Sequence, residues 1–415
     1  MLKEPKGREV GVSVLQAGEI IKVRIEDIAF GGAGVGRVQG MVVFVPFTVT
    51  NDEVAVKILS VRKKFALAEV TQILEPSADR VVPACHYFGR CGGCQLQHIA
   101  YERQLAIKEK QVSEIFIRLG NFSSPPLLGI IPSPGRLHYR GKAEYHVRRA
   151  PDGRFLSLGF MEQASDSVLD IARCEIVAES INQSCLEFRA ALRKGAKKYQ
   201  RRRQTLWSAD EEGTISAIPD DDATRPLITR IVRNKRFLVP YGGFFQINTT
   251  LLDGLVDQVL TLADLTGAET VLDAYCGVGL FSLFLAAAAG SIMGIEIDGP
   301  AVHCARENLK AAGSDNVLFL HGDVGKVIKQ QITKRGRLVD VVILDPPRSG
   351  CDRSVLDSLR TSAVKKVIYI SCNPATQARD LRYLVESGFS LERLQPLDMF
   401  PQTGHIEVIA LLKAK

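Results

Sequence analysis

The thiol of Cys372 is the side chain of this sequence best placed for covalent chemistry. Residues 367–379, VIYISCNPATQAR, put it where an apolar strand breaks into an Asn-Pro turn and a polar helix start. Residues 271–282, VLDAYCGVGLFS, and residues 341–350, VVILDPPRSG, repeat the pattern of an apolar strand that ends in a Gly or Pro turn. Such strands, separated by helical patterns, predict a doubly wound α/β sheet with its ligand site at the carboxyl ends of the strands. We therefore expect the thiol to share that edge with a small-molecule pocket.

A glycine pair and two acidic residues predict the ligand of that pocket. Gly277 and Gly279 let the backbone turn tightly and approach a ligand, although a lone GxG is a weak signal. Glu296 ends the next strand, 19 residues beyond Gly277, where a carboxylate usually holds a ribose diol. Asp323 ends the third strand, where it can meet an adenine edge. Because the chain has no P-loop GK[ST], S-adenosylmethionine fits better than NAD or ATP; an α/β core that binds no nucleotide is the alternative.

Three further cysteines have the spacing of metal ligands. Cys85, Cys91 and Cys94 form a C-x5-C-x2-C pattern, and a reducing cytosol disfavours disulfides between them. Zinc usually uses paired C-x2-C knuckles, whereas only one such pair is present, so an iron-sulfur cluster, a zinc site and no metal at all stay open. Cys174 is the best fourth ligand, since Cys185 lies in a helical pattern that predicts a buried core residue.

The positive charge of the chain predicts an acidic partner. The sequence has 53 Lys and Arg against 46 Asp and Glu, a net charge of +7. Eight cations and no acid fall between residues 189 and 203, which favours nucleic acid facing them, with a solvated helix face as the alternative. These cations are Arg189, Arg193, Lys194, Lys197, Lys198, Arg201, Arg202 and Arg203.

The length of 415 residues predicts two or three domains. Residues 19–74 contain four or five short alternating strands with a glycine cluster, as in an OB-like barrel, and Arg62, Lys63, Lys64 and Phe65 suit binding of single-stranded nucleic acid or form a charged hairpin tip. No apolar run reaches 18 residues and the N-terminus has no signal-peptide core, so we predict a cytoplasmic protein without a membrane span.

Six motifs in order give the chain a specific family resemblance. It resembles the RNA uracil-C5 methyltransferases that make 5-methyluridine, in the subgroup with an N-terminal TRAM barrel and an iron-sulfur cluster. The motifs are CGGCQLQHIAYERQLAIK, GGFFQINT, DAYCGVGLFS, LDPPRSG, YISCNPATQARDL and MFPQTGHIEVIALL. The resemblance implies a TRAM barrel at 11–74, a central iron-sulfur and RNA-binding domain at 75–239, and a Rossmann-like S-adenosylmethionine-dependent methyltransferase domain at 240–415.

The resemblance also implies a role for each matching residue. Cys372 matches the nucleophile and Glu407 the base. Positions that line the S-adenosylmethionine pocket match Gln246, Tyr275, Leu280, Glu296, Asp323 and Asp345. Cys85, Cys91, Cys94 and Cys174 match the ligands of a [4Fe-4S] cluster.

The chemistry explains why these residue types are needed. Carbon 5 of uracil is a weak nucleophile, so a thiolate first adds at carbon 6 and pushes electron density onto carbon 5. After methyl transfer a positioned carboxylate must remove the carbon 5 proton before the thiol can leave. Three rival thiols are present, and we expect Cys276 to pack behind the bound methionine and Cys304 to lie in the core. Cys351 follows DPPRSG, close to where cytosine-C5 methyltransferases place a nucleophile, but the Pro-Pro-Arg here lacks their Pro-Cys arrangement, so cytosine is a disfavoured alternative.

Several alternatives stay open from the sequence. The 23S ribosomal RNA is the first-choice substrate and transfer RNA the second, and a monomer is the default. A nitrogen methyltransferase is disfavoured because Arg348 replaces the aromatic residue of DPPY loops. A catalytically inactive RNA-binding iron-sulfur or zinc protein is disfavoured because both Cys372 and Glu407 are present.

Overall fold

The computed structural model describes residues 15–195, 203–210, 213–216 and 226–415, and these fall into two compact units. Unit 1 holds the described residues up to 89 and residues 94–107. Unit 2 holds residues 90–93 and the described residues from 108 to 415. Helix α1 (Tyr101–Arg118) begins in unit 1 and continues into unit 2. The domain boundaries inferred from the resemblance stay a prediction.

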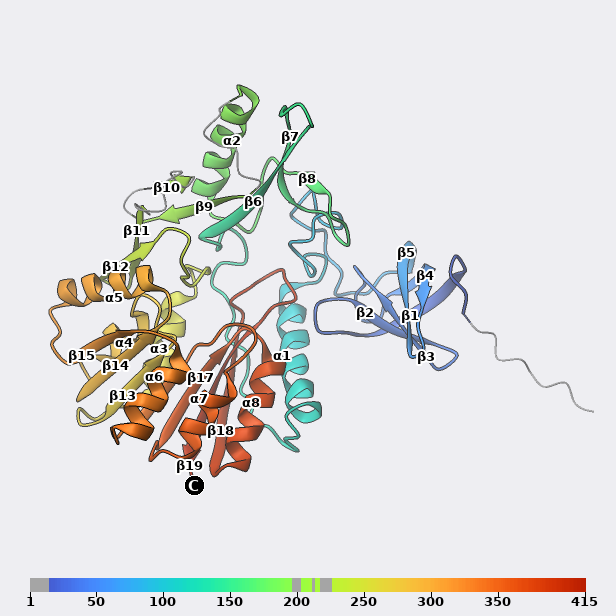
Figure 1. Ribbon diagram of the computed structural model, residues 1–415. Coiled ribbons are helices and arrows are strands. Elements are labelled where there is room, and N and C mark those ends of the chain that lie inside the picture. The colour runs from blue at the N-terminus through green and yellow to red at the C-terminus, as the bar shows by residue number, and fades with distance from the viewer. Residues whose placement is uncertain (1–14, 196–202, 211–212, 217–225) are drawn as a thin grey trace, which may run out of the picture. The chain divides into compact units, whose positions relative to one another are not determined.

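Unit 1 is built around a closed five-stranded barrel, which confirms the predicted barrel (Figure 1). The strand order is β1-β2-β3-β5-β4, and alternate residues such as Val23, Ile25 and Val43 point into its core. Gly36 lies against Val23 and the backbone of Arg24, where no Cβ would fit. The strands are β1 (Ile20–Ile28), β2 (Gly34–Val38), β3 (Met41–Val45), β4 (Glu53–Val61) and β5 (Phe65–Glu75).

The middle of the chain forms an antiparallel sheet in unit 2 with strand order β10-β9-β6-β7-β8. Helix α2 (Glu179–Arg193) packs on it through Ile181, Cys185 and Phe188, so the core role predicted for Cys185 is confirmed. A separate hairpin, β11 (Leu227–Val232) with β12 (Lys235–Pro240), follows. The sheet strands are β6 (Lys142–Arg149), β7 (Phe155–Met161), β8 (Val168–Asp170), β9 (Arg203–Ala209) and β10 (Gly213–Ser216).

The basic run after residue 188 differs from the expected single helix. Helix α2 ends at Arg193, and Arg203 starts strand β9. Arg189 is buried and donates to the carbonyls of Leu158 and Ile171, because its spacing on α2 turns it toward the sheet. Arg193 and Lys194 are exposed. The remaining predicted cations, Lys197, Lys198, Arg201 and Arg202, lie outside the described residues.

The carboxyl-terminal part is a seven-stranded sheet of order β15-β14-β13-β16-β17-β19-β18. The first five strands are parallel, and β19 runs antiparallel to its neighbours β17 and β18. This arrangement confirms the predicted doubly wound sheet. The strands are β13 (Thr270–Ala274), β14 (Ser291–Glu296), β15 (Val317–His321), β16 (Val341–Leu344), β17 (Lys366–Ser371), β18 (Phe389–Leu397) and β19 (Glu407–Ala414).

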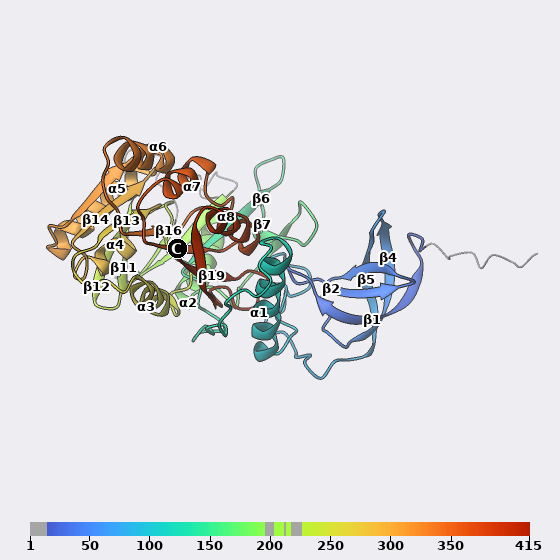
Figure 2. The same cartoon turned by 90° about the horizontal axis from the view of Figure 1, so that it is seen from below.

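Alternating residues of these strands feed two cores, because successive side chains point to opposite faces of a sheet. Helices α3 (Leu252–Ala263), α4 (Leu280–Leu285) and α5 (Gly299–Ala312) cover one face. Helices α6 (Val324–Ile328), α7 (Arg353–Arg360), α8 (Pro374–Glu386) and part of α1 cover the other, and a π-helical turn, Lys329–Lys334, extends α6. Figure 2 shows α6 and α7 on one side of this sheet and α3 on the other. Among the described residues, no helix has the length and apolar content needed to cross a membrane.

The loop after β13 gives a test of this packing. Gly279 has φ +86°, and a Cβ there would lie 2.7 Å from Phe319 Cζ. We expect Gly279→Ala to lower the free energy of unfolding by about 2–5 kcal/mol, since left-handed strain adds to overpacking. Urea unfolding followed by circular dichroism measures the loss.

Gly313 provides the matched control. It also has a positive φ, +65°, but a Cβ there would meet no atom within 4 Å. Gly313→Ala should therefore lose only the strain component, about 1–2 kcal/mol. Equal losses in the two variants would contradict the packing argument.

Candidate active site

A cavity of about 620 Å³ lies at the carboxyl ends of the parallel strands. Its lining includes every residue predicted for catalysis or cofactor binding except Leu280: Gln246, Tyr275, Glu296, Asp323, Asp345, Cys372 and Glu407. These positions span more than 160 residues of sequence, and the sheet topology brings them together. Leu280 is instead buried at the start of α4, in the core on one face of the sheet.

The loop between β13 and α4 has three residues with a left-handed backbone conformation beside the cavity. Tyr275, Gly277 and Gly279 all have positive φ values, of 65°, 55° and 86°. Such a value is costly for a residue with a Cβ, and strained residues of this kind cluster at ligand sites. The tyrosine side chain and the Gly277 backbone both line the cavity.

The Glu296 carboxylate is fixed between two backbone donors. One oxygen accepts from the N–H of Gly277 at 3.0 Å, and the other accepts from the N–H of Asp298 at 2.8 Å. The carboxylate therefore ties the loop after β13 to the end of β14. Asp323 is held in a similar way, since it caps α6 by accepting from the N–H of Lys326 at 2.9 Å. Both acids face the cavity in preset orientations.

Asp345 is the carboxylate whose protonation is most finely balanced. Burial, with the nearby Asp273 carboxylate and then Glu296, raises the pKa of Asp345 to about 7. The Gln246 side-chain amide opposes this shift by donating to Asp345 Oδ2 at 3.2 Å. At neutral pH, the Asp345 carboxyl can therefore either donate or accept a hydrogen bond in the cavity.

Strand register places Cys372 beside Glu407. Ser371 at the end of β17 pairs with Val408 of β19, and Leu397 of β18 pairs with Glu407. Cys372 therefore follows its strand at the point where Glu407 begins the neighbouring one. Cys372 is half-buried and Glu407 is 3% exposed, and both side chains line the cavity.

The local sequence fixes the elbow that carries Cys372. Asn373 caps α8 by accepting from the N–H of Ala375 at 3.2 Å, and Pro374 starts that helix. The Asn373 amide also donates to the carbonyl of Arg348 at 2.9 Å. This bond joins the elbow to the loop after β16, which contains Asp345.

Burial raises the pKa of both groups at the elbow. It raises the pKa of the Cys372 thiol, and the Glu407 carboxylate adds to the effect. It also raises the pKa of Glu407 well above its ordinary value, with the Asp345 carboxylate as a second cause. Arg348 opposes both shifts, since its guanidinium bonds the thiol sulfur and its positive charge favours the two anions.

Arg348 is a functional candidate that the sequence did not single out. It lines the cavity, and its cation is the group that favours the thiolate form of Cys372. Its place in the LDPPRSG motif could have marked it as a candidate. The sequence does not show, however, which side chain a loop arginine faces. The structure also adds Phe244 and Phe400 to the lining.

The rival thiols are poor nucleophiles where the structure places them. Cys276, Cys304 and Cys351 are buried. Burial raises the pKa of Cys304 to about 11 and that of Cys351 to about 12, and it raises the pKa of Cys276 well above the ordinary value. Because the thiolate is the reactive form, these groups should react slowly. The predicted core position of Cys304 is confirmed.

The four cysteines of the predicted cluster lie on half-buried loop positions in the two units. Cys85 and Cys94 belong to unit 1, and Cys91 and Cys174 to unit 2. None of the cysteines, all of which lie in described segments, forms a disulfide. Within the described part of the chain, no three His, Cys, Asp or Glu side chains form a group that could hold a metal ion. The predicted cluster is therefore not confirmed by this structure.

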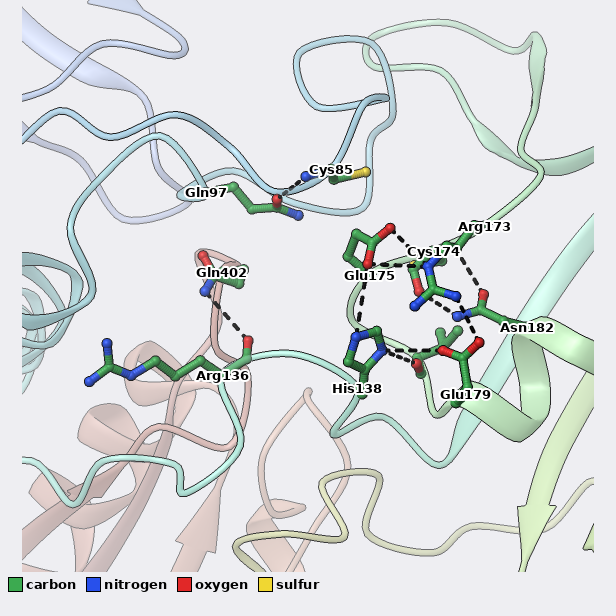
Figure 3. A network of polar contacts seen from close by, with 11 residues as sticks. Cys85, Gln97, Arg136, His138, Arg173, Cys174, Glu175, Glu179, Asn182 and Gln402 are labelled. Atoms are coloured by element: carbon green, nitrogen blue, oxygen red, sulfur yellow. Dashed lines mark hydrogen bonds and ion pairs between the residues drawn. The ribbon is translucent and has the colours of Figure 1, made fainter.

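Local contacts around these cysteines nevertheless suit thiolate ligands. The N–H of Gly93 donates to Cys91 Sγ at 3.4 Å, a bond type that tunes metal-bound sulfur. The buried Asn182 side chain accepts from the N–H of Cys174 at 2.9 Å and donates to its carbonyl at 3.1 Å. Figure 3 shows this clamp beside Arg173, which bonds Glu175 and Glu179.

Basic residues outside the 189–203 run are found in two settings. Arg62, Lys63 and Lys64 are exposed at the turn between β4 and β5. Lys142 is partly buried, donates to the carbonyl of Gly243 at 3.0 Å and lies 4.3 Å from the centre of the Trp207 ring. Lys142 therefore supports the loop that carries Phe244 and Gln246.

Two family models match the chain. The tRNA (Uracil-5-)-methyltransferase model matches residues 229–415, and the TRAM domain model matches residues 14–71. An uncharacterized RNA methyltransferase of Halalkalibacterium halodurans is 33% identical over 449 residues, which cover 96% of this chain and 97% of that protein. Another, from Thermosynechococcus vestitus, is 32% identical over 452 residues, with 97% and 99% covered.

A solved structure has the same fold over almost the whole chain. It is the Pyrococcus abyssi tRNA (uracil-54, C5)-methyltransferase in complex with S-adenosyl-L-homocysteine, with a TM-score of 0.72 and 23% sequence identity. The match covers 94% of this chain and 99% of that one.

Alkylation of Cys372 tests the electrostatics of the cavity. Arg348→Gln removes the cation that lowers the pKa of this thiol. The pKa should rise, so the midpoint of the alkylation profile should move to higher pH and the rate at pH 8 should fall roughly threefold to tenfold. Peptide mass spectrometry after timed iodoacetamide treatment measures it.

Arg353→Gln is the control, because Arg353 lies on α7 over the Tyr383 ring and does not line the cavity. Its alkylation profile should match that of the unaltered protein. An unchanged profile in Arg348→Gln would show that the guanidinium does not act on Cys372.

Proposed function

The chain belongs to the RNA uracil-5-methyltransferase family, with a TRAM domain in its N-terminal part, and from this we propose that it methylates carbon 5 of a uridine in RNA. The methyl donor is S-adenosylmethionine and the product is 5-methyluridine. The observation that carries the proposal is the placement of Cys372 and Glu407 at neighbouring strand ends in one cavity lined with carboxylates.

The part of the cavity at the end of β14 is suited to bind the cofactor. The Glu296 carboxylate, fixed by the Gly277 and Asp298 N–H groups, can accept hydrogen bonds from a ribose diol. Asp323 would meet the adenine, and Gln246, Tyr275 and Asp345 would line the rest of the cofactor pocket. When bound, S-adenosylmethionine supplies an electrophilic methyl group on a sulfonium. Leu280 would act through packing rather than direct contact, since it does not line the cavity.

Cys372 starts the reaction as the nucleophile. Its sulfur adds to carbon 6 of uracil, and the electron pair of the 5,6 double bond then makes carbon 5 nucleophilic. Burial keeps the thiol protonated at neutral pH, so it must lose its proton as the uridine enters. The Arg348 guanidinium favours that ionisation.

Glu407 completes the reaction as the base. Once carbon 5 has accepted the methyl group, the Glu407 carboxylate removes the carbon 5 proton, the double bond re-forms and the Cys372 thiolate leaves. The raised pKa of Glu407 makes it a stronger base than an exposed glutamate, provided that it is ionised at that step. Arg348 favours the ionised form.

The proposed RNA is 23S ribosomal RNA, with transfer RNA as the second candidate. The family resemblance favours the first, because the TRAM barrel and cluster accompany ribosomal targets in much of the family. The second is favoured by the Pyrococcus abyssi relative, which is named for uridine 54 of transfer RNA. The exposed Arg62, Lys63 and Lys64 beside Phe65 suit binding of the flanking strand. A cytoplasmic monomer is part of the same proposal.

We also propose that Cys85, Cys91, Cys94 and Cys174 hold a [4Fe-4S] cluster. Their spacing, partial burial and lack of disulfides support it, as do the Gly93 and Asn182 contacts. Methyl transfer is redox-neutral, so the cluster would hold the loops and position RNA.

RNA that carries 5-fluorouridine tests the reaction. Fluorine does not leave as a cation, so the intermediate should stall with RNA bonded to Cys372. We expect a shifted band on a denaturing gel that needs S-adenosylmethionine and is absent in Cys372→Ala. Running 23S and transfer RNA side by side identifies the substrate. No band with either RNA, despite cofactor binding by calorimetry, would count against uracil-C5 chemistry.

Glu407→Gln tests the base. With ordinary RNA, this variant should add the methyl group and then stall, because nothing removes the carbon 5 proton. The covalent adduct should accumulate and turnover should fall by about 10²–10⁴-fold, the usual contribution of a general base. Normal turnover in this variant would assign proton removal to another group, with Asp345 as the nearest carboxylate that acts on Glu407.

Metal analysis tests the cluster. Protein purified without oxygen should contain iron, sulfide and a brown chromophore, and Cys174→Ser should lose all three. Cys185→Ser is the control, since that thiol is buried in the core formed with α2. Zinc in place of iron, or a chromophore retained in Cys174→Ser, would overturn this ligand assignment.

A further inference from the structure

The loop between β18 and β19 has its own buried anchor. Residues 398–406 connect Leu397 to Glu407, which pair with each other across the hairpin. No residue of the loop belongs to a strand, although the N–H of Asp398 donates to the carbonyl of Ile131 at 2.9 Å, and Gln402 adopts φ +69°. Phe400, the third residue of the loop, lines the cavity. Strand pairing sets the backbone position of Glu407, and the loop that leads into it needs further support.

Three consecutive carbonyls of the loop each accept a hydrogen bond from a different part of the chain. Asn248 Nδ2 donates to Met399 O at 3.2 Å, Lys108 Nζ to Phe400 O at 3.0 Å, and the Tyr139 hydroxyl to Pro401 O at 3.0 Å. All three donor residues are at most 1% exposed. Figure 3 shows one more anchor, the Gln402 amide directed at the carbonyl of Arg136, at 3.4 Å.

Lys108 is the charged member of this set. Its ammonium also donates to Asp398 Oδ1 at 2.5 Å, and the two side chains are 1% and 0% exposed. Burial lowers the pKa of Lys108, and the Asp398 carboxylate opposes that shift. A buried ion pair is often no more stabilising than a well-packed apolar pair, but it is favourable only in a narrow range of distances and orientations. One ammonium here fixes both the first residue and the third residue of the loop.

The charge of Lys108 is also felt near the reacting groups. Burial, followed by the positive charges of Arg348, Lys108 and Arg140, lowers the pKa of His405 to about 4. The His405 ring packs edge-on against Phe400, with 5.9 Å between ring centroids. His405 is two residues before Glu407, so the charge of Lys108 acts close to the start of β19.

We propose that Lys108 is a positioning residue for Glu407: by holding Asp398 and the Phe400 carbonyl, it fixes the 398–406 loop and so the direction of the base. This inference rests on the proposed function, since it assigns Lys108 to the proton-removal step of that reaction. Lys108 is not among the residues that line the cavity, so it does not contact the reacting groups directly.

Lys108→Met tests the proposal, because it keeps the length of the side chain and removes the ammonium. Turnover on ordinary RNA should fall about a hundredfold, the cost of a displacement of roughly 1 Å at a reacting group. Cofactor affinity should stay unchanged. The covalent Cys372 adduct should accumulate with ordinary RNA, which loss of stability alone would not produce.

Two further variants separate position from stability. Lys108→Met combined with Asp398→Leu removes both charges, so its melting temperature should recover while its turnover stays low. Tyr139→Phe removes only the hydroxyl donor to Pro401, and it should show a smaller fall with the same adduct. Its outcome decides the question if Lys108→Met does not fold.

Lys366→Met is the matched control. Lys366 lies at the opposite end of β17 and donates to the carbonyl of Ala263, so its loss should not change turnover per folded molecule. Wild-type turnover in Lys108→Met or in the double variant, or a fall without adduct, would overturn the inference. If the unaltered protein forms no adduct on 5-fluorouridine RNA, the proposed function fails first.

Discussion

The register between β17 and β19 is the constraint on which the site depends. A parallel sheet brings the carboxyl ends of its strands to one edge, but β19 runs antiparallel to both of its neighbours, β17 and β18. The antiparallel β19 therefore begins where β17 ends, and Ser371 opposite Val408 puts Glu407 next to the thiol of Cys372. A slip of one residue would turn Glu407 to the other face of the sheet.

Desolvation then sets the chemistry of that edge. Asp345, Glu407 and Cys372 each lose solvation in the cavity, and each negative charge raises the pKa of its neighbours. Arg348 is the counterweight, and it acts on both the thiol and Glu407. The raised pKa values favour the protonated forms of Cys372 and Glu407, so both groups must lose a proton before they can act as nucleophile and base in the proposed reaction.

Hydrogen bonds hold the loops around the cavity in place. The Glu296 carboxylate is held by two N–H groups, the Cys372 elbow is bonded to the Arg348 carbonyl, and the 398–406 loop is anchored through three carbonyls. The bonds to the 398–406 loop join segments far apart in sequence, whereas the bond between Glu296 and Asp298 is local. The strain of a positive φ at Tyr275 and Gln402 is tolerated because the neighbouring contacts over-determine those loops.

The sequence by itself determined the fold class and most of the candidate site. Apolar strands that end in Gly or Pro turns predicted the doubly wound sheet and the position of Cys372, and alternating short strands predicted the barrel. These features are local, so periodicity and turn chemistry reveal them. Strand ends also predicted Glu296 and Asp323, whereas the family resemblance supplied Gln246, Tyr275, Asp345 and Glu407. Side-chain direction depends on contacts with distant segments. The basic run was predicted to follow one exposed helix, which placed Arg189 on the surface, whereas the structure buries it.

Only the tertiary structure decided which residues act on one another. It removed Leu280 from the cavity lining, put Arg348 beside the thiol and paired Lys108 with Asp398 across 290 residues of sequence. Such pairings follow from strand order and helix packing, which bring distant segments together with no sequence signal of their own. The four cysteines predicted as cluster ligands are a second example. Their spacing predicts a ligand set, but among the described residues no group that could hold a metal ion is found.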